Sequence, residues 1–207
     1  MTKQLYEQLQ DEKALPCWCL RVPFDKLKST FNPDLIDFDK GWGGYITLID
    51  APDHKIKTLY LTGELSVQSH NHRREVWTLI KGRAKILLGR VPENIRKGVM
   101  ESGLSYSKEL SQQIEQMLKN MTITHFTEPA QQKIIYENEL HTAVNINRDG
   151  YTAISEIALG TADEQDILRF YDKTGRVRIL SANQGRSILD MLDTPPPEET
   201  IGVHING

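Results

Sequence analysis

Short apolar runs that alternate with polar residues fill the chain from residue 42 to about residue 160. A period of two residues is typical of β-strands, because successive side chains of a strand point to opposite faces. Turn-forming residues separate the runs, as at residues 50–53, Gly63 and residues 81–82. The pattern predicts nine strands, at residues 45–49, 57–61, 65–70, 76–80, 84–88, 121–126, 133–136, 142–146 and 152–158. Many short strands at this spacing favour an all-β fold, an antiparallel sandwich or barrel.

One segment, at about residues 91–121, has a helical period instead. Its apolar residues recur every three or four positions and share one face: Leu110, Ile114, Met117, Leu118 and Met121. Ser105 or Ser107 is suited to begin the helix as its N-cap. We therefore expect one α-helix inserted between two strands and packed on the outside of the barrel. A lid over a site and a dimer contact are the alternatives for this insertion.

The segments on either side of the alternating pattern do not show this alternation and are interrupted by prolines. Residues 1–40 are mixed and carry three prolines, which interrupt regular structure, and three consecutive prolines stand at residues 195–197. The chain has 207 residues, so a single domain is the first expectation. We expect an N-terminal extension at residues 1–40, a β-domain at residues 41–180 and a C-terminal tail at residues 181–207.

Charge and composition narrow the class of protein. The net charge of −3 gives no general attraction to nucleic acid or to an anionic membrane. No apolar run approaches the roughly 20 residues of a membrane-spanning helix, and the N-terminus lacks the apolar core of a signal peptide. Cys17 and Cys19 are too close in sequence to bridge readily, so no disulfide framework is expected. A cytoplasmic protein with reduced thiols is the prediction.

Candidate chemistry is concentrated around residue 70. Gln68, His70 and His72 alternate along a predicted strand and so share one face, and Glu75 follows shortly after them. His141 stands at the edge of another predicted strand. Imidazole nitrogens and a carboxylate that converge from rigid strands suit a divalent cation. The sequence therefore predicts a metal site inside the β-domain.

The spacing of these residues resembles the two sequence motifs of the cupin family. Six residues separate Glu75 from Gly82, and His141 stands four positions before Asn145. Aligned on these motifs, the four ligand positions fall on Gln68, His70, Glu75 and His141, with His72 as an alternative ligand. The resemblance implies a cupin double-stranded β-helix, a jelly-roll barrel.

Three segments narrow the resemblance to the cupin domain of type II mannose-6-phosphate isomerases, the C-terminal domain of the bifunctional mannose-1-phosphate guanylyltransferase/mannose-6-phosphate isomerase. Residues 65–77 are similar to its "LSLQxHHHRAEHW" segment, residues 41–45 to its opening "PWGxY", and residues 166–176 to its closing "DIVRFEDxYGR". One departure lies just before His141, where residues 136–140 lack the proline and glycine of the usual turn.

The resemblance implies a metal-dependent aldose–ketose isomerase that interconverts mannose 6-phosphate and fructose 6-phosphate. Zinc is the first expectation for the metal, with manganese, iron, cobalt or nickel as alternatives. Arg73 is assigned by resemblance to substrate or transition-state charge, and Arg169 to the phosphate group. A salt bridge of Arg169 to Asp166 or Asp172 is the structural alternative. The expected partner is a small-molecule sugar phosphate, and a homodimer paired through sheet edges is a further expectation.

Several assignments stay open at the level of sequence. Glu137 and Glu139 flank the site in the sequence. We expect one of them to point to solvent; either is a candidate base near the metal, but no pattern identifies the general base. Trp42 and Trp77 are better explained as core residues than as platforms for a sugar ring. Two other functions compete with the isomerase: a cupin metal-dependent dioxygenase and a non-catalytic sugar-binding or regulatory cupin. A site in which His72 replaced Gln68 would favour the dioxygenase.

Overall fold

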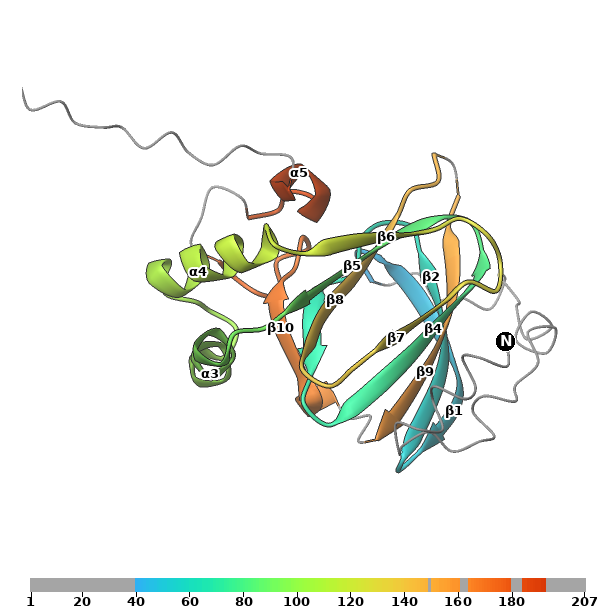
Figure 1. Cartoon of the computed structure of the whole chain (residues 1–207), viewed down its shortest axis with the longest axis horizontal. Coiled ribbons are helices and arrows are strands. Elements are labelled where there is room, and N and C mark those ends of the chain that lie inside the picture. The colour runs from blue at the N-terminus through green and yellow to red at the C-terminus, as the bar shows by residue number, and fades with distance from the viewer. Residues whose placement is uncertain (1–39, 149, 161–163, 180–183, 193–207) are drawn as a thin grey trace, which may run out of the picture.

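The computed structural model of the chain describes residues 40–148, 150–160, 164–179 and 184–192. In this part of the chain, ten strands form two five-stranded sheets that close into a barrel (Figure 1). The first sheet has the order β1-β2-β9-β4-β7 and the second β10-β3-β8-β5-β6. The strands of the first sheet are β1 (Gly43–Ala51), β2 (His54–Leu61), β4 (Arg73–Lys81), β7 (Gln132–Ile135) and β9 (Thr152–Gly160). Those of the second are β3 (Val67–His70), β5 (Ala84–Arg90), β6 (Thr122–Phe126), β8 (Glu139–Asn145) and β10 (Ile167–Tyr171).

The order of the strands is that of a double-stranded β-helix. The chain crosses from one sheet to the other at most of its connections, so strands from early and late in the sequence lie side by side. β2 pairs with β9 and β3 pairs with β8 and β10, all antiparallel. This topology confirms the predicted all-β jelly-roll barrel. Several predictions lie outside the described residues. They concern residues 1–39 of the expected N-terminal extension (1–40), the cysteines Cys17 and Cys19, and the prolines at 195–197.

Each of the nine predicted strands has a counterpart in the structure, and one strand was missed. β10 is a five-residue edge strand in which Arg169 interrupts the apolar residues, so the sequence carries no clear alternation there. It pairs with β3 along Gln68 to His70, which places the end of the domain beside the candidate metal residues. The proposed domain boundaries at residues 40, 41, 180 and 181 themselves stay predictions.

The inner faces of the two sheets enclose an apolar core that fills one part of the barrel. Its buried members include Leu59, Leu61, Trp77, Leu79, Ile86, Phe126 and Ile154. Trp42 belongs to the same cluster, so both tryptophans are core residues, as expected. Several polar and charged side chains are buried as well, among them His70, Arg73, Glu75 and His141.

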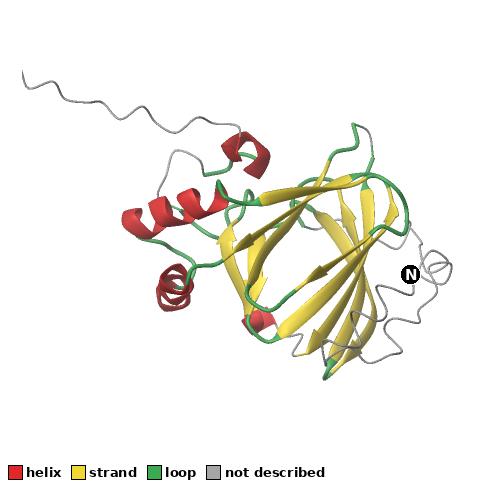
Figure 2. Cartoon of the chain, viewed as in Figure 1, coloured by secondary structure: helices red, strands yellow, loops and turns green. Residues whose placement is uncertain are grey.

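The predicted helical insertion lies where expected but contains two helices, not one. These are α3 (Glu93–Ser102) and α4 (Lys108–Leu118), and both lie on one side of the barrel with α5 (Ile188–Leu192) (Figure 2). α3 ends at Gly103, whose positive φ of 64° is a backbone conformation that favours glycine. Ser107 then begins α4, because its side chain accepts a hydrogen bond from the backbone N–H of Leu110 at 3.1 Å.

The helices cover the outer face of the second sheet, as the sequence predicted. Ile114 and Leu118 of α4 are fully buried in one cluster with Leu87 and Leu140 of that sheet. α5, within the segment expected as a C-terminal tail, adds Ile188 to the same cluster. Nowhere in the described ranges does a helix have the length and apolar character needed to span a bilayer.

Candidate metal centre

Three residues from both sheets bring possible metal-binding atoms together inside the barrel. His70 comes from β3 and His141 from the neighbouring β8, while Glu75 comes from β4 of the opposite sheet. Their candidate ligand atoms all lie within 4.8 Å of one another. All three side chains are buried, with exposed fractions of 1% or less. We call His70, Glu75 and His141 the metal cluster.

Backbone and indole groups hold two members of the metal cluster in position. His141 Nδ1 lies 2.9 Å from the carbonyl oxygen of Glu139 and donates its proton there, which leaves the lone pair of Nε2 to point into the cluster. His141 Nε2 is 3.6 Å from Glu75 Oε2. The indole N–H of Trp77 donates to the same Glu75 oxygen at 3.0 Å. Such supporting hydrogen bonds orient the ligands of known metal sites.

Arg73 lies directly against the metal cluster. His70 Nε2 is 3.0 Å from Glu75 Oε1 and 3.1 Å from Arg73 Nη2. Arg73 Nε is 3.2 Å from the same oxygen of Glu75. The guanidinium group is 4% exposed, so its charge is removed from water and acts strongly on its neighbours. The family resemblance assigned Arg73 to binding the charge of the substrate or transition state. The structure places Arg73 next to the metal cluster.

The electrostatic environment favours the protonation states that bind metals. Burial by itself would raise the pKa of Glu75, but the charge and hydrogen bond of His70, with the charges of Arg73 and His141, outweigh it and hold that pKa well below its usual range. Burial, together with the charge of His70, lowers the pKa of His141 to about 4. At neutral pH the site therefore presents a carboxylate and a neutral imidazole.

An unsatisfied atom of the metal cluster fits a bound cation. His141 Nε2 is buried and has no hydrogen-bond partner among the residues that the structure describes. A buried acceptor of this kind is costly unless something binds it. Two imidazole nitrogens and one carboxylate form a donor set suited to zinc and to other divalent transition metals. The metal cluster can thus hold a metal ion.

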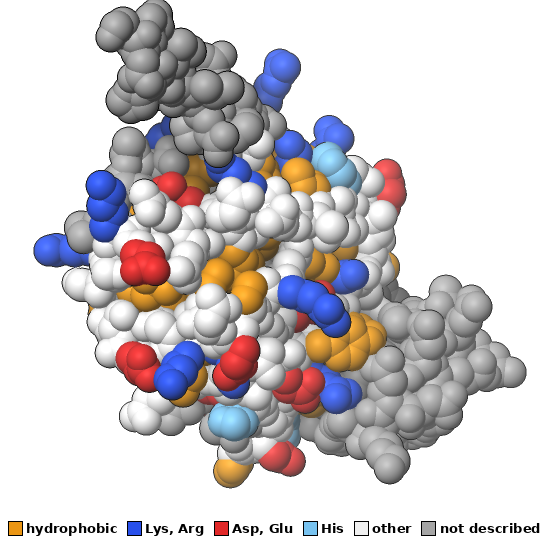
Figure 3. All heavy atoms as spheres, turned by 60° about the vertical axis from the view of Figure 1, so that its left-hand side comes forward, with side chains coloured by type: hydrophobic (Ala, Val, Ile, Leu, Met, Phe, Trp, Pro, Cys, Tyr) orange, Lys and Arg blue, Asp and Glu red, His pale blue; other side chains and the backbone are white. Residues whose placement is uncertain are grey.

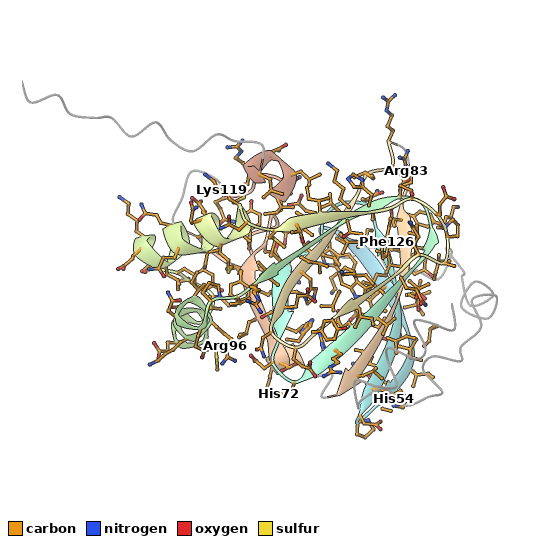
Figure 4. The ribbon with its side chains drawn as sticks, in the orientation of Figure 1. His54, His72, Arg83, Arg96, Lys119 and Phe126 are labelled. Atoms are coloured by element: carbon orange, nitrogen blue, oxygen red, sulfur yellow. The ribbon has the colours of Figure 1, made fainter. Side chains whose placement is uncertain are left out.

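The other two residues weighed as metal ligands lie in different places. Gln68 is paired across the strands with His141 and with Arg169, so the three share one face of the sheet. Its side-chain oxygen accepts a hydrogen bond from Ser66 at 3.0 Å, and Gln68 stands beside the metal cluster. His72 is exposed in the turn between β3 and β4, at the edge of the barrel (Figure 4). The structure does not bring His72 into the cluster.

Arg169 lies on β10, half-buried, opposite Gln68. The two aspartates that the sequence offered as its salt-bridge partners engage other groups. Asp166 accepts the backbone N–H groups of Asn71 and His72 at 3.1 Å. Asp172 accepts from Arg176 Nε at 2.5 Å and from the backbone N–H of Thr174 at 2.8 Å.

The two glutamates considered as bases next to the metal have partners in the β7–β8 turn. Both carboxylate oxygens of Glu137 lie 2.8 Å from Arg74 Nε. Glu139 accepts the backbone N–H of Tyr136 at 3.0 Å. Only the backbone carbonyl of Glu139 reaches the metal cluster, through His141. These contacts give both carboxylates a role in holding the turn.

The sequence analysis did not identify two charged residues of the inner face, Glu156 and Lys57. Glu156 of β9 is the cross-strand neighbour of Trp77 and of Lys57. Glu156 is 5% exposed, and its carboxylate lies 3.9 Å from Lys57 Nζ. The signal in the sequence is a glutamate at a position that the alternation with Ile154 and Ala158 assigns to the interior. A charged residue at a core position of a strand is a candidate functional residue.

A hollow of about 1040 Å³ lies between the end of β5, the end of α4 and the β7–β8 turn. Its lining includes Arg90, Lys133 and Tyr136 as well as apolar residues, and Figure 3 shows hydrophobic side chains in a hollow on the side of the molecule that carries the helices. None of the three metal-cluster residues lines it. The hollow shares only Glu139 with the groups that support the metal cluster.

Comparison with known families agrees with the motif resemblance. Residues 36–102 match the model of a family described as mannose-6-phosphate isomerase C-terminal. The match includes His70, Arg73 and Glu75, whereas His141 lies beyond it. The resemblance inferred from the motifs is thus confirmed for this part of the chain. The comparison with curated proteins found no match.

Several solved structures are similar to the chain. A double-stranded β-helix protein from Klebsiella pneumoniae is 18% identical over 64% of this chain and 91% of its own, with a TM-score of 0.42. The cupin domain of Cnp3 from Schizosaccharomyces pombe is 9% identical over 63% and 72%, with a TM-score of 0.42. The capsular polysaccharide assembling protein CapF from Staphylococcus aureus is 13% identical over 79% and 44%, with a TM-score of 0.46.

Proposed function

We propose that the chain is a metal-dependent aldose–ketose isomerase of sugar phosphates, with mannose 6-phosphate and fructose 6-phosphate as substrates. The observation that carries the proposal is the contact of Arg73 with the metal cluster, at 3.1 Å from His70 and 3.2 Å from Glu75. The arginine and two of the cluster residues also fall within the segment that matches the isomerase family. A cation site with a buried guanidinium group beside it suits a reaction in which negative charge develops on substrate oxygens.

The metal would be held by His70, Glu75 and His141, with Gln68 as a neighbouring oxygen donor. Zinc is the first candidate, and manganese, iron, cobalt and nickel are alternatives that metal analysis distinguishes. When bound, the metal supplies Lewis acidity toward the oxygens of the substrate. Glu75 and His141 enter this role in the protonation states that the buried environment favours.

Besides the metal, Arg73 and Arg169 would bind the substrate. Isomerisation between an aldose and a ketose moves a proton between C1 and C2 through a cis-enediol. Arg73, oriented by Glu75 and His70, would stabilise the negative charge that builds up on the enediol oxygens. Arg169 shares a face with Gln68, and its forked guanidinium group suits a phosphate. Burial of the cluster excludes water from the reacting atoms.

The test is an isomerase assay on the purified protein. The formation of fructose 6-phosphate from mannose 6-phosphate is followed with and without a chelator, and for the variants Arg73→Ala and Arg83→Ala. Arg83 is an exposed arginine at the other end of the barrel and serves as the matched control (Figure 4). We expect chelator-sensitive turnover that Arg73→Ala lowers by about 100-fold or more and that Arg83→Ala leaves intact. An active Arg73→Ala enzyme would remove the assigned role of Arg73.

One observation favours a second candidate function. Two histidines and one carboxylate are also the ligand set of non-haem iron oxygenases. An iron-dependent dioxygenase would consume oxygen when loaded with Fe(II), and it would not require Arg73. Saturable sugar-phosphate binding without turnover in the metal-loaded protein would instead indicate a binding or regulatory cupin. A cytoplasmic location, a homodimer, and the absence of nucleic-acid and membrane partners accompany the proposal as predictions.

A further inference from the structure

We propose that Glu156, with Lys57 beside it, is the acid–base residue that moves the substrate proton between C1 and C2. This inference rests on the proposed isomerase function and gives it the general base that the sequence could not identify. It depends on where Glu156 lies, on its partners, and on the roles that occupy the other carboxylates near the metal cluster.

Strand register places Glu156 on the inner wall of the barrel. Glu156 pairs with Trp77 on one side and with Lys57 on the other, and directly paired residues of neighbouring strands share one face. Trp77 belongs to the apolar core between the sheets, and its indole donates to Glu75 of the metal cluster. Glu156 therefore faces the interior, one cross-strand neighbour away from the residue that holds Glu75.

The charges around Glu156 link it to the same site. Burial, followed by the negative charge of Glu75, raises the pKa of Glu156, while the positive charges of Lys57, Arg73 and His70 oppose that change. All of these residues act on Glu156 through space, so its carboxylate shares the electrostatic environment of the metal cluster. A carboxyl group in this setting exchanges a proton more readily near neutral pH than an exposed glutamate does.

The contact with Lys57 is poor as a structural ion pair. The distance of 3.9 Å is too long for a hydrogen bond, although the side chains of Lys57 and Glu156 are only 14% and 7% exposed. The partly exposed pair of Arg74 and Glu137 closes to 2.8 Å. A buried carboxylate without a hydrogen bond costs stability, so a structural role does not explain Glu156. The ammonium group of Lys57 is instead placed to compensate its charge when the proton leaves.

The other carboxylates near the site have partners that occupy them. Glu75 belongs to the metal cluster, Glu137 binds Arg74, and Glu139 binds the backbone of the β7–β8 turn. Glu64 accepts hydrogen bonds from Ser187 and from the backbone of Ile188. Among the described carboxylates near the metal cluster, these contacts leave Glu156 as the one whose oxygens are not committed to a hydrogen bond.

The proton transfer balances without any further reactant. The Glu156 carboxylate takes the proton from C2 of the open-chain aldose, the C2–H electron pair becomes the C1–C2 double bond, and the carbonyl π pair moves onto O1. The protonated Glu156 then returns its proton to C1. The O2 hydroxyl proton passes to O1 as the C2 carbonyl forms, which completes the ketose. Carbon C1 is reduced and C2 is oxidised within one molecule, and the enzyme ends as it began.

The experiment compares Glu156→Gln with Glu64→Gln in the metal-loaded protein. Both changes remove a buried negative charge with little change of shape, but only Glu156 is assigned to the reaction. We expect Glu156→Gln to lower kcat on mannose 6-phosphate by about 10²- to 10⁴-fold. Its metal content and thermal unfolding midpoint should not fall, because the lost charge has no hydrogen bond in the fold. Substrate deuterated at C2 should show a larger isotope effect on the residual rate. Glu64→Gln should keep kcat.

The outcomes separate this inference from the proposed function. A wild-type enzyme that is active beside an equally active Glu156→Gln overturns the inference and leaves the isomerase proposal standing. A wild-type protein without isomerase activity overturns both. If Glu156→Gln does not fold, Lys57→Gln replaces it, with an expected fall in kcat of about tenfold or more, and an unchanged kcat in that variant overturns the inference.

Discussion

At the scale of single residues, the site depends on one glutamate. Glu75 is fully buried and contacts His70, Arg73, Trp77 and His141. Its negative charge balances the buried guanidinium group and attracts a cation to the two histidines. Burial would by itself favour the neutral acid, so the ionised state depends on these partners.

Replacement of Glu75 by glutamine should weaken both metal binding and folding. The variant leaves the charge of Arg73 buried without its partner, and broken buried pairs cost roughly 3–5 kcal/mol of unfolding free energy. Denaturant unfolding of the metal-free proteins measures this loss, with Glu137→Gln in the exposed turn as the control. Equal stabilities of the two variants would argue against a buried ion pair at Glu75.

The stability of the metal-free protein should fall as the pH decreases from about 6.5 to about 4. His141 has its pKa lowered to about 4 in the fold, whereas the unfolded chain takes up this proton near pH 6.5. Between these values the unfolded state binds more protons, so stability rises with pH. The contribution is about 1.4 kcal/mol for each pH unit.

Unfolding free energies at a series of pH values, in the presence of a chelator, test this expectation. The variant His141→Gln lacks the titrating ring and should show a shallower slope in the same window. Parallel slopes for the two proteins would mean that His141 does not enter the fold in its neutral form.

Sequence reasoning found residues that carry a spacing pattern and missed those that do not. His70, Glu75 and His141 were recognised because two motifs fix their separations, and Arg73 because it stands inside one of them. Glu156 has no such neighbours in the sequence, and only the pairing of β9 with β4 and β2 brings it to the site. The exposure of His72 could not be predicted either, since a turn after His70 ends the alternation.

At the scale of elements, the turn between β3 and β4 decides where His70 and Glu75 meet. The carboxylate of Asp166 accepts two consecutive backbone N–H groups of this turn, at Asn71 and His72. Asp166 itself is 5% exposed and ends the short 3₁₀ helix η3 (Glu164–Asp166) before β10. A late segment of the chain thus fixes the geometry of an early one.

The variant Asp166→Ala should loosen the metal site without removing a ligand. Loss of a hydrogen-bonding group that orients the ligands of a metal site typically lowers the affinity for the metal by about 10- to 100-fold. A metal titration of the purified variant measures the effect, and Asp53→Ala, an exposed aspartate at a different turn, is the control. An affinity equal to that of the wild type would show that the turn holds its shape without Asp166.

The helical insertion offers a test of the local fold. The sequence left Ser105 and Ser107 as alternative caps, and the structure selects Ser107. Ser107→Ala should lower the free energy of unfolding by about 1 kcal/mol, whereas Ser105→Ala should have little effect. The break into two helices was not predicted, because the apolar period continues through Ile95 and Val99 and hides the turn at Gly103.

At the scale of the whole molecule, the metal cluster joins the two sheets of the barrel. Glu75 belongs to the first sheet, and both histidines belong to the second. A metal bound to all three would tie the sheets together and stabilise the fold by mass action, by about 2.7 kcal/mol at a free metal concentration 100 times Kd. The all-β architecture itself was predictable from the alternation, whereas the closure of the barrel around the site depends on long-range pairing.

The most direct measurement is elemental analysis of the purified protein, alone and as the variant His70→Ala/His141→Ala, after both are loaded with zinc and dialysed. The account predicts close to one metal ion per wild-type chain, a higher unfolding temperature in its presence, and loss of both in the variant. A wild-type chain that retains no transition metal under these conditions, or a variant that retains as much as the wild type, would contradict it.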